Sequence, residues 1–332
     1  MGIKGLTQLL KKLAPDSYEH CKLYKLSDKK VAIDASLFIY QSLIVYRKNC
    51  DYIRNDKNEN ISHIIGILNK TVTYLSYNIT PIYIFDGSPP EEKSEVIKER
   101  KEKACNANEK LSDESIDPCM IEKYNKQSIR LTKKIIDDVK NLLNTLGVSY
   151  IVSNGEAEGL ASELCRQKFV DFVISEDMDC LPFGANYLVR NCIDKTVKMK
   201  DSITIFDLNK VLESLELTHD QFIELCILCG CDYCKNIPRI GSITGYKIIK
   251  KHGTIESYLN STNVKNVPEN YIEKYKKSKE LFNIYNQKVN IDDINIHSSH
   301  IDIANVVNYL SNTCNYNLNK INSLIHKIQN KY

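Results

Sequence analysis

The chain of 332 residues has no apolar run that approaches the roughly 20 residues needed to cross a bilayer, which excludes a helical membrane protein. We expect no secretory leader, because Lys11 and Lys12 interrupt the apolar face of the helix expected over 1–16. It shows no internal repeat, which excludes a repeat protein. Gly2 is not a myristoylation site, since Leu6 stands where that signal requires Ser or Thr. We therefore expect a soluble protein without a membrane anchor.

The charge balance is close to neutral, with a formal net charge of +3. So small an excess does not indicate nucleic-acid binding unless the basic residues gather on one face. Apolar residues make up 42% of the chain and charged residues 26%, which are ordinary values for a globular protein. Twelve cysteines are scattered through apolar and helical segments without an export signal. They indicate a reduced intracellular compartment rather than a disulfide framework.

Three short apolar runs end in acidic residues, at 30–34, 81–86 and 169–179. Each is typical of a buried strand, and helical patterns at 63–77 and 129–146 lie between them. Alternating strands and helices predict an α/β fold with a mostly parallel sheet flanked by helices. Because ligands bind beyond the carboxyl ends of such strands, the acidic residues there are candidates for a functional site.

The candidate site consists of seven carboxylates. They are Asp34, Asp86, Glu156, Glu158, Asp177, Asp179 and Asp232. Any one of them can instead cap a helix or form a turn, so each alone is as readily structural as functional. Together they are expected to meet at one sheet edge, where like charges are unfavourable without a cation. Hard oxygen ligands favour Mg²⁺ or Mn²⁺ over zinc, and a pair of such ions supports the hydrolysis of phosphodiesters.

Residues 91–134 are mostly polar and charged, and we interpret them as an excursion from the core. The first arm favours a helix on which Lys93 and Arg100 lie two turns apart on one face. The second arm is basic, and Arg130 and Lys134 are its candidates for binding DNA. The usual alternative for such a run is a solvated hairpin whose charges pair with one another. Because seven carboxylates exceed the charge of two divalent ions, a basic neighbour is needed to attract an anionic substrate, and the pair on the first arm is suited to this.

Six segments of the chain resemble the flap endonuclease family in order, spacing and residue identity. They are MGIKGLTQLL, KVAIDASLFIYQ, PIYIFDGSPPEEKS, NGEAEGLAS, ISEDMDCLPFG and LCILCGCDYC. The resemblance implies a PIN-like nuclease core with a helical arch and a helix-hairpin-helix DNA-binding module. It also implies a structure-specific nuclease that hydrolyses phosphodiester bonds at 5′ flaps and acts as a 5′ exonuclease, in DNA replication and repair.

The resemblance assigns roles to individual residues. It places the seven carboxylates in a two-metal site for Mg²⁺, in which Mn²⁺ substitutes. It puts Lys93 and Arg100 at the scissile phosphate as catalytic residues. It also puts Tyr40 under a base next to the cut, where stacking is worth roughly 1 to 3 kcal/mol, although a core tyrosine is the plain alternative. The amine of Gly2 is expected close to the active site.

The turn of the expected DNA-binding module reads IPRIGSITG at 237–245 and departs from the family pattern Gly-Ile-Gly-Pro-Lys. Arg239 stands at the first glycine position, which puts the tight turn in doubt. The resemblance implies that the module binds the duplex backbone, with K⁺ at the turn, through contacts that position DNA without reading its sequence. The candidates in this chain are Arg239, Gly241, Lys247 and Lys250.

Four cysteines form the pattern C-x2-C-x-C-x2-C, which suggests zinc or an iron–sulfur cluster. They are Cys226, Cys229, Cys231 and Cys234. We favour the alternative that they are small apolar residues of a buried helix and turn. The family carries cysteine at the first and last of these positions without a metal.

The expected order of domains is an N-terminal nuclease region at 1–105, the arch at 91–134, an internal nuclease region at 135–217, the DNA-binding module at 218–260 and a helical C-terminal region at 261–332. The alternatives are a Holliday-junction resolvase or a processive 5′–3′ exonuclease of the same superfamily, and a non-catalytic DNA-binding scaffold. The short arch favours the flap enzyme, and the complete acidic set counts against the scaffold.

Branched or flapped DNA is the expected partner, bound by a monomer with an affinity that falls as salt rises. The chain stops at Tyr332 without the family's sliding-clamp motif, so we expect weak or absent clamp binding by that route. It has no basic run that addresses it to a nucleus. By analogy with the family we expect an intracellular location, in a nucleus or a viral replication compartment.

Overall fold

The computed structural model describes residues 2–48, 51–113, 116–191, 201–261, 264, 266–284, 296–297 and 302–329. The chain forms two compact units, each assembled from three stretches of sequence. Unit 1 comprises Met1–Lys25, Gly87–Val96 and Ser153–Ile294, and unit 2 comprises Leu26–Asp86, Ile97–Val152 and Asn295–Tyr332. None of the described helices combines the length and the apolar character that a membrane crossing requires. The end of the chain, on which the clamp expectation rests, lies partly outside the described residues.

Unit 1 contains four neighbouring strands, of which β7 and β8 are parallel while β9 is antiparallel to both β8 and β1. Their order is β1 (Tyr18–Lys22), β9 (Ser202–Asp207), β8 (Tyr187–Asn191) and β7 (Phe172–Ile174). The accompanying helices are α1 (Leu6–Leu13), α7 (Ala157–Arg166) and α8 (Leu208–Leu215), with 3-10 turns at Pro15–Ser17, Glu91–Lys93 and Met178–Cys180. The helix α1 is amphipathic, because Leu6, Leu9 and Leu10 recur at helical spacing and are buried.

The second part of unit 1 is helical. It consists of α9 (His219–Cys229), α10 (Ser242–His252), α11 (Ile255–Ser261) and α12 (Tyr271–Ile284). Thr218 and Gln221 form a capping box that starts α9, and Gly230 ends it with a φ of 98°. The buried carboxylate of Glu224 ties these helices together, because it accepts hydrogen bonds from the Ile255 amide and the Tyr275 hydroxyl.

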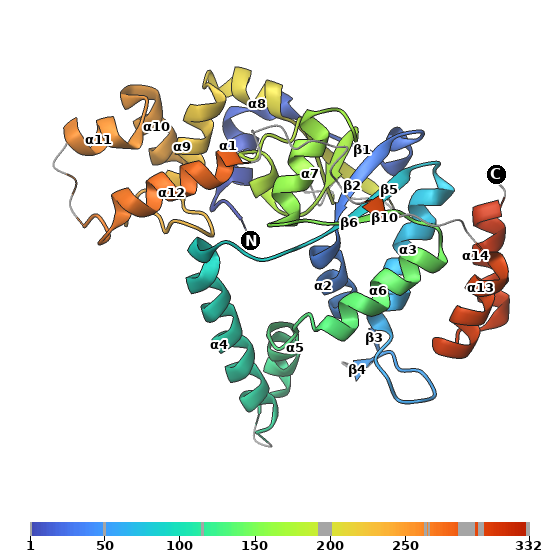
Figure 1. Ribbon diagram of the computed structural model, residues 1–332. Coiled ribbons are helices and arrows are strands. Elements are labelled where there is room, and N and C mark those ends of the chain that lie inside the picture. The colour runs from blue at the N-terminus through green and yellow to red at the C-terminus, as the bar shows by residue number, and fades with distance from the viewer. Residues whose placement is uncertain are drawn as a thin grey trace. The chain divides into compact units, whose positions relative to one another are not determined.

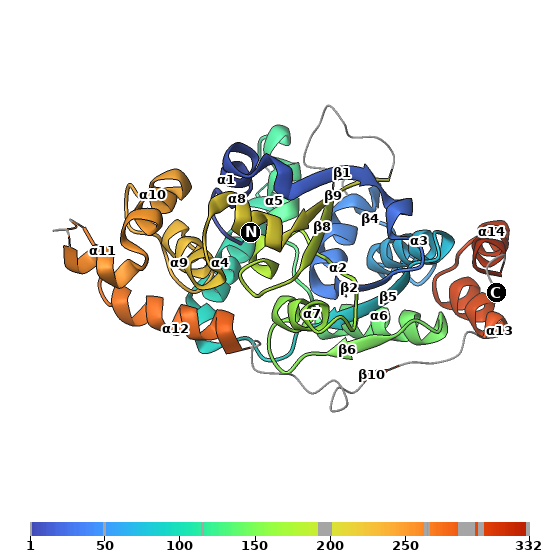
Figure 2. The same ribbon diagram turned by 90° about the horizontal axis from the view of Figure 1, so that it is seen from above.

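Unit 2 contains a second set of four strands, in which β2, β5 and β6 run parallel and β10 is antiparallel to β6. Their order is β2 (Lys30–Asp34), β5 (Thr80–Phe85), β6 (Tyr150–Val152) and β10 (Ile296–His297). The helices around them are α2 (Ala35–Val45), α3 (Ser62–Ser76), α6 (Lys133–Thr145), α13 (Ile303–Asn308) and α14 (Leu318–Gln329), with a π-helical turn at Tyr309–Thr313. Figure 2 shows α14 beside α3, and the short strands Arg47–Lys48 (β3) and Asp51–Tyr52 (β4) pair with each other.

The helices α4 (Ser94–Leu111) and α5 (Pro118–Gln127) form the hairpin predicted as an excursion, and Figure 1 shows them as two arms. Contacts within unit 2 hold the arms together. The Arg130 guanidinium donates to the carbonyl of Lys101 at 2.5 Å and lies 3.1 Å from the Cys105 sulfur. The Lys110 ammonium donates to the Tyr124 hydroxyl at 3.2 Å.

The prediction of an α/β fold with a mostly parallel sheet flanked by helices is confirmed, and its details are corrected. The strand expected over 169–179 is limited to β7, because Asp177 caps a 3-10 turn there and ends the extended backbone. The antiparallel strands were not predicted. In β1 the sequence YEHCK is partly exposed along its whole length, so it has no apolar run from which a strand is recognised.

Candidate active site

Unit 1 brings five of the seven predicted carboxylates into one acidic cluster. They are Glu156, Glu158, Asp177, Asp179 and Asp232. The first two stand at the start of α7, as its N-cap residue and in its first turn, where the helix dipole favours negative charge. The next two belong to a 3-10 turn after β7, and the last follows α9. The ends of separate elements therefore converge on one place, as predicted for this part of the set.

Asp179 is the most confined of these carboxylates, with 5% of the residue exposed. Its Oδ1 atom has no hydrogen-bond partner among the described residues. Burial raises the pKa of Asp179 well above its usual value, and the neighbouring charges of Asp177, Asp232 and Glu158 raise that pKa further. A buried carboxylate oxygen without a donor, surrounded by like charges, favours the binding of a cation or a proton.

Lys93 provides one positive charge at the cluster. Its ammonium donates to Oε1 of Glu156 and lies 3.7 Å from Oδ2 of Asp232. Burial by itself lowers the pKa of Lys93, but attraction to Glu156 and Glu158 outweighs burial and raises that pKa, so the side chain stays charged. Lys93 ends a 3-10 turn that leads directly into α4, and its predicted place on one helical face with Arg100 stays a prediction. Arg100 lies in unit 2, exposed on α4.

Gly2 reaches the cluster through its backbone. It has a φ of +80°, and a Cβ atom added to it would lie 1.9 Å from Oδ1 of Asp177 and 2.7 Å from Oδ1 of Asp179. A side chain at this position would force the chain or the two carboxylates to move, and the positive φ favours glycine independently. The structure thus places Gly2 beside the predicted carboxylates of unit 1.

Sequence reasoning missed Tyr233, although it is adjacent to Asp232 in the segment LCILCGCDYC. Its hydroxyl donates to Oε2 of Glu156, and 5% of the residue is exposed. Burial raises the pKa of Tyr233, and the negative charge of Glu156 raises it further, so the phenol remains protonated. The position within a motif that also holds a carboxylate was the available signal.

The remaining two carboxylates, Asp34 and Asp86, lie in unit 2. Asp34 ends β2, is buried, and accepts a hydrogen bond from the Leu37 amide at 3.0 Å as the N-cap of α2. Asp86 follows β5 directly and is exposed. Because β2 and β5 are parallel and Asp34 is in register with Ile84, both carboxylates lie at the same edge of this sheet. Asp34 therefore caps a helix, which is the structural alternative for a single carboxylate. It also lies at the sheet edge where the metal site was predicted.

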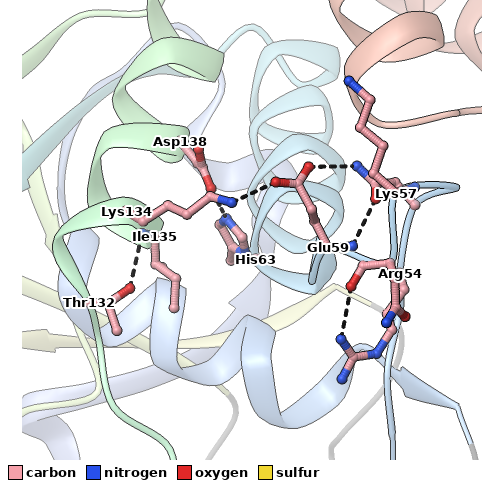
Figure 3. Close-up of polar contacts among 10 residues, drawn as sticks. Arg54, Lys57, Glu59, His63, Thr132, Lys134, Ile135 and Asp138 are labelled. Atoms are coloured by element: carbon pink, nitrogen blue, oxygen red, sulfur yellow. Dashed lines mark hydrogen bonds and ion pairs between the residues drawn. The ribbon is translucent and has the colours of Figure 1, made fainter.

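Three predicted DNA contacts have protein partners within unit 2. The Tyr40 hydroxyl donates to the carbonyl of Lys126 at 2.9 Å, which ties α2 to α5. Arg130 is bonded to α4, and Lys134 pairs with Glu59 at 2.7 Å (Figure 3). Their roles toward DNA stay predictions.

A buried histidine lies close to the Lys134 ion pair. His63 is 1% exposed, and its Nε2 atom lies 3.2 Å from Oδ2 of Asp138, as Figure 3 shows. Its Nδ1 atom has no hydrogen-bond partner in the described part of the chain. Burial lowers the pKa of His63, and the hydrogen bond to Asp138 offsets this only in part. The ring is therefore neutral at pH 7.

This histidine makes unit 2 sensitive to acid. Because the folded pKa of His63 lies below the usual 6.5, the unfolded chain binds the proton more readily. The stability that depends on neutral His63 is complete above pH 6.5 and is lost as the pH falls through the folded pKa. When the pH is lowered from 7.5 to 5.5, we expect the Tm of His63→Gln to fall by less than the Tm of the native chain. Thermal melts at both pH values measure this.

The change in Tm between the two pH values must be compared between the native chain and the variant, because other groups titrate in the same pH range. His219 in unit 1 also has a lowered pKa, through burial, and contributes with the same sign. Asp179 has a raised pKa and contributes with the opposite sign. An unchanged difference in Tm between the two pH values in His63→Gln would contradict the assignment.

The hairpin turn between α9 and α10 is formed in spite of its altered sequence. Arg239 adopts a left-handed backbone with a φ of +68°, at the position where the family has glycine. The Ile240 amide donates to the carbonyl of Ile237 at 3.1 Å, and the Asn236 side chain donates to the carbonyl of Ile240 at 3.3 Å. Gly241 caps α10, and an added Cβ there would meet no atom within 4 Å. The tight turn therefore forms with arginine at this position, and the left-handed backbone of Arg239 is strained.

The strain predicts a stabilising substitution. A left-handed residue other than glycine costs about 1 to 2 kcal/mol, and glycine's larger unfolded entropy removes part of the gain. We expect Arg239→Gly to raise the free energy of unfolding by about 0.5 to 1 kcal/mol. Urea titration measures it. Arg239→Ala is the control, since it removes the charge but keeps the strain, and an equal gain in that variant would contradict the explanation.

The other basic residues of this module are exposed. Lys250 pairs with Glu216 at 2.7 Å, while Lys247 lies on the same helix. The four nearby cysteines of the C-x2-C-x-C-x2-C pattern are all buried and reduced. Burial raises the pKa of Cys229 to about 12 and that of Cys234 to about 11, so both remain thiols at neutral pH.

The acidic cluster fits a divalent cation by its chemistry. All of its donors are carboxylate oxygens, the ligands that Mg²⁺ and Mn²⁺ prefer, and one buried oxygen of Asp179 lacks a donor. Within the described residues, no three acidic, histidine or cysteine side chains are arranged to hold an ion as they stand. The Lys93 ammonium forms ion pairs with both Glu156 and Asp232 at this cluster.

Comparison with known proteins agrees with this site. A model of the XPG N-terminal domain matches residues 1–107, and a model of the XPG I-region matches residues 147–232. Flap endonuclease 1-A of Sorghum bicolor is 39% identical over 99% of this chain and 87% of its own length. Flap endonuclease 1 of Entamoeba histolytica is 37% identical over 99% of this chain and 88% of its own length.

Solved structures show the same fold. Flap endonuclease-1 from Methanococcus jannaschii has a TM-score of 0.71 and 28% identity, with 95% of this chain and 97% of that chain covered. The catalytic core of Rad2 in complex with DNA substrate has a TM-score of 0.72 and 22% identity, covering 98% and 100%. The Holliday junction-resolving enzyme GEN1, in complex with product DNA, Mg²⁺ and Mn²⁺, has a TM-score of 0.60 and 19% identity, covering 98% and 76%. Since relatives are 37 to 39% identical across nearly its whole length, this chain belongs to the flap endonuclease family of nucleases.

Proposed function

We propose that this chain hydrolyses phosphodiester bonds at 5′ flaps, with 5′ exonuclease activity, in DNA replication and repair. The observation that carries the proposal is the buried carboxylate of Asp179, whose Oδ1 lacks a donor within an acidic cluster beside Lys93. Such a cluster favours the binding of cations, and without them its negative charge repels an anionic substrate. Family membership supplies the substrate class.

The residues act together as follows in this proposal. The seven carboxylates hold two Mg²⁺ or Mn²⁺ ions, which activate a water molecule and stabilise the departing oxygen when bound. Lys93 leaves Glu156 to neutralise the scissile phosphate, and Arg100 supplies a second positive charge there. Neither side chain needs to move a proton, because both remain charged at neutral pH.

The DNA contacts are also proposals. Tyr40 stacks on a base next to the cut after its hydrogen bond to Lys126 opens. Arg130 and Lys134 likewise leave their protein partners and bind the phosphate backbone of the DNA. The module at 218–260 holds the duplex through Arg239, Gly241, Lys247 and Lys250, with K⁺ at its turn. Affinity is then expected to fall steeply with salt, and each lost phosphate contact lowers the salt slope by about 1.

Cleavage of three end-labelled DNAs tests the function. A flap, a gapped duplex and a four-way junction are each incubated with Mg²⁺ and with chelator, using the native chain and Asp179→Ala. We expect Mg²⁺-dependent cutting at the base of the flap, lost in the variant. Preferred cutting of the junction favours the resolvase alternative. DNA binding without any cutting in Mg²⁺ or Mn²⁺ overturns the proposal in favour of a DNA-binding scaffold.

A further inference from the structure

We infer that Tyr233 is a positioning residue that orients Glu156 for the binding of a divalent cation; the inference rests on the proposed function. Glu156 is buried at the N-cap of α7, and its two carboxylate oxygens have different donors. The Lys93 ammonium donates to Oε1, and the Tyr233 hydroxyl donates to Oε2. The carboxylate is thus held from both sides.

The two donors differ in what happens when a cation binds. Lys93 carries a positive charge, so it is repelled by a cation at the cluster and exchanges with it at Oε1. The Tyr233 hydroxyl carries no charge, so its hydrogen bond to Oε2 remains compatible with a cation on the other oxygen. Tyr233 therefore keeps the carboxylate in place during the exchange, which is the role of a group in the outer shell of a metal site.

The ring of Tyr233 is itself fixed by an aromatic row in unit 1. Phe282 of α12 is fully buried, and its ring lies edge-on to Tyr233 with centroids 5.4 Å apart. Phe282 also meets Phe183, with centroids 4.9 Å apart. The Phe183 amide donates to the carbonyl of Asp179 at 3.1 Å. One helix outside the cluster thus supports both Glu156 and the backbone of Asp179.

The chain offers a matched control. Tyr275 is 4% exposed, close to the 5% of Tyr233, and its hydroxyl donates to Oε1 of Glu224 at 2.7 Å. Tyr275→Phe deletes the same kind of buried tyrosine–glutamate hydrogen bond away from the cluster. The comparison of Tyr233→Phe with Tyr275→Phe therefore separates the effect on the cation from the general cost of losing such a bond.

The test is a calorimetric titration of Mn²⁺ into the full chain without DNA, with Tm measured in chelator as a check of folding. We expect Tyr233→Phe to raise the Kd for Mn²⁺ by about 10- to 100-fold. Tyr275→Phe should leave that Kd within about twofold of the native value. Its Tm in chelator should fall by about as much as that of Tyr233→Phe. Phe282→Leu keeps the hydroxyl but loosens the ring, so it should weaken Mn²⁺ binding in the same direction and less.

Two results overturn the inference. One is an unchanged Kd for Mn²⁺ in Tyr233→Phe, and the other is an equal rise in Tyr275→Phe. In either case the native chain still binds Mn²⁺ and cuts flaps, so the proposed function survives. A native chain that binds no Mn²⁺ and cuts no flap overturns both.

Discussion

Replacement of Asp179 by Asn is expected to abolish cleavage and, without metal, to make the protein more stable. The carboxylate is buried, its Oδ1 lacks a donor, and its pKa is raised by burial and then by Asp177 and other acidic neighbours. Because the folded pKa lies above the unfolded value, the charged form lowers stability at neutral pH, and this loss is relieved as the pH falls. The amide removes the charge and keeps the shape.

The expected sizes follow from the two roles of the carboxylate. Loss of a cation ligand removes several kcal/mol of stabilisation from the transition state, so cleavage should fall by about 10³-fold or more. Removal of an uncompensated buried charge should add about 1 to 3 kcal/mol to the free energy of unfolding in chelator. Single-turnover cleavage of a labelled flap and urea titration in chelator measure the two effects.

A buried carboxylate that has its partner is the control. Glu163 on α7 is fully buried, and Arg166 donates to its two oxygens at 2.7 and 2.8 Å. Glu163→Gln should therefore lose stability, in contrast to Asp179→Asn. If Asp179→Asn lowers the free energy of unfolding in chelator as Glu163→Gln does, the carboxylate is not the uncompensated charge that the structure indicates.

Gly2→Ala is expected to cause the second large effect. The added methyl group would lie 1.9 Å from Oδ1 of Asp177 and 2.7 Å from Oδ1 of Asp179, so the start of the chain or the carboxylates must move. A misplacement of about 1 Å in a catalytic site costs on the order of 10²-fold in rate. We expect a loss of that size in single-turnover cleavage, with the fold retained in thermal melts.

Gly253→Ala controls for the backbone conformation. Gly253 has a φ of +78°, close to the +80° of Gly2, but the nearest atom to an added Cβ is 4.0 Å away. The control variant should lose about 1 kcal/mol of stability from the left-handed backbone and cut saturating flap DNA at nearly the native rate. Equal losses of cleavage in both variants would assign the effect to backbone strain rather than to the clash.

The electrostatic state of the cluster explains why Lys93 lies where it does. The Lys93 ammonium compensates part of the negative charge of Glu156 and Asp232. Its pairing satisfies these two carboxylates but leaves Oδ1 of Asp179 without a donor in the described residues. The negative charge of the cluster is therefore only partly compensated by Lys93.

The sequence by itself determined the class of fold and the candidate carboxylates. The alternation of apolar runs with helical patterns reports the α/β arrangement, because buried strands and amphipathic helices leave different periodicities. Acidic residues at the ends of such runs are visible for the same reason, as Asp34 at the end of β2 shows. Short edge strands left no such trace, since β1 is partly exposed and β10 has two residues.

Only the tertiary structure decided which side chains have partners. Tyr233 bonds to Glu156 across a long separation in sequence, and no local pattern encodes that contact. Arg130 and Lys134 were predicted to bind DNA, and the structure gives them protein partners on α4 and at Glu59, which no sequence pattern identified. The conformation of Arg239 was equally hidden, because a left-handed arginine is held by its surroundings rather than by its own preference. Composition and spacing are local properties, whereas burial, pairing and pKa depend on residues that only folding brings together.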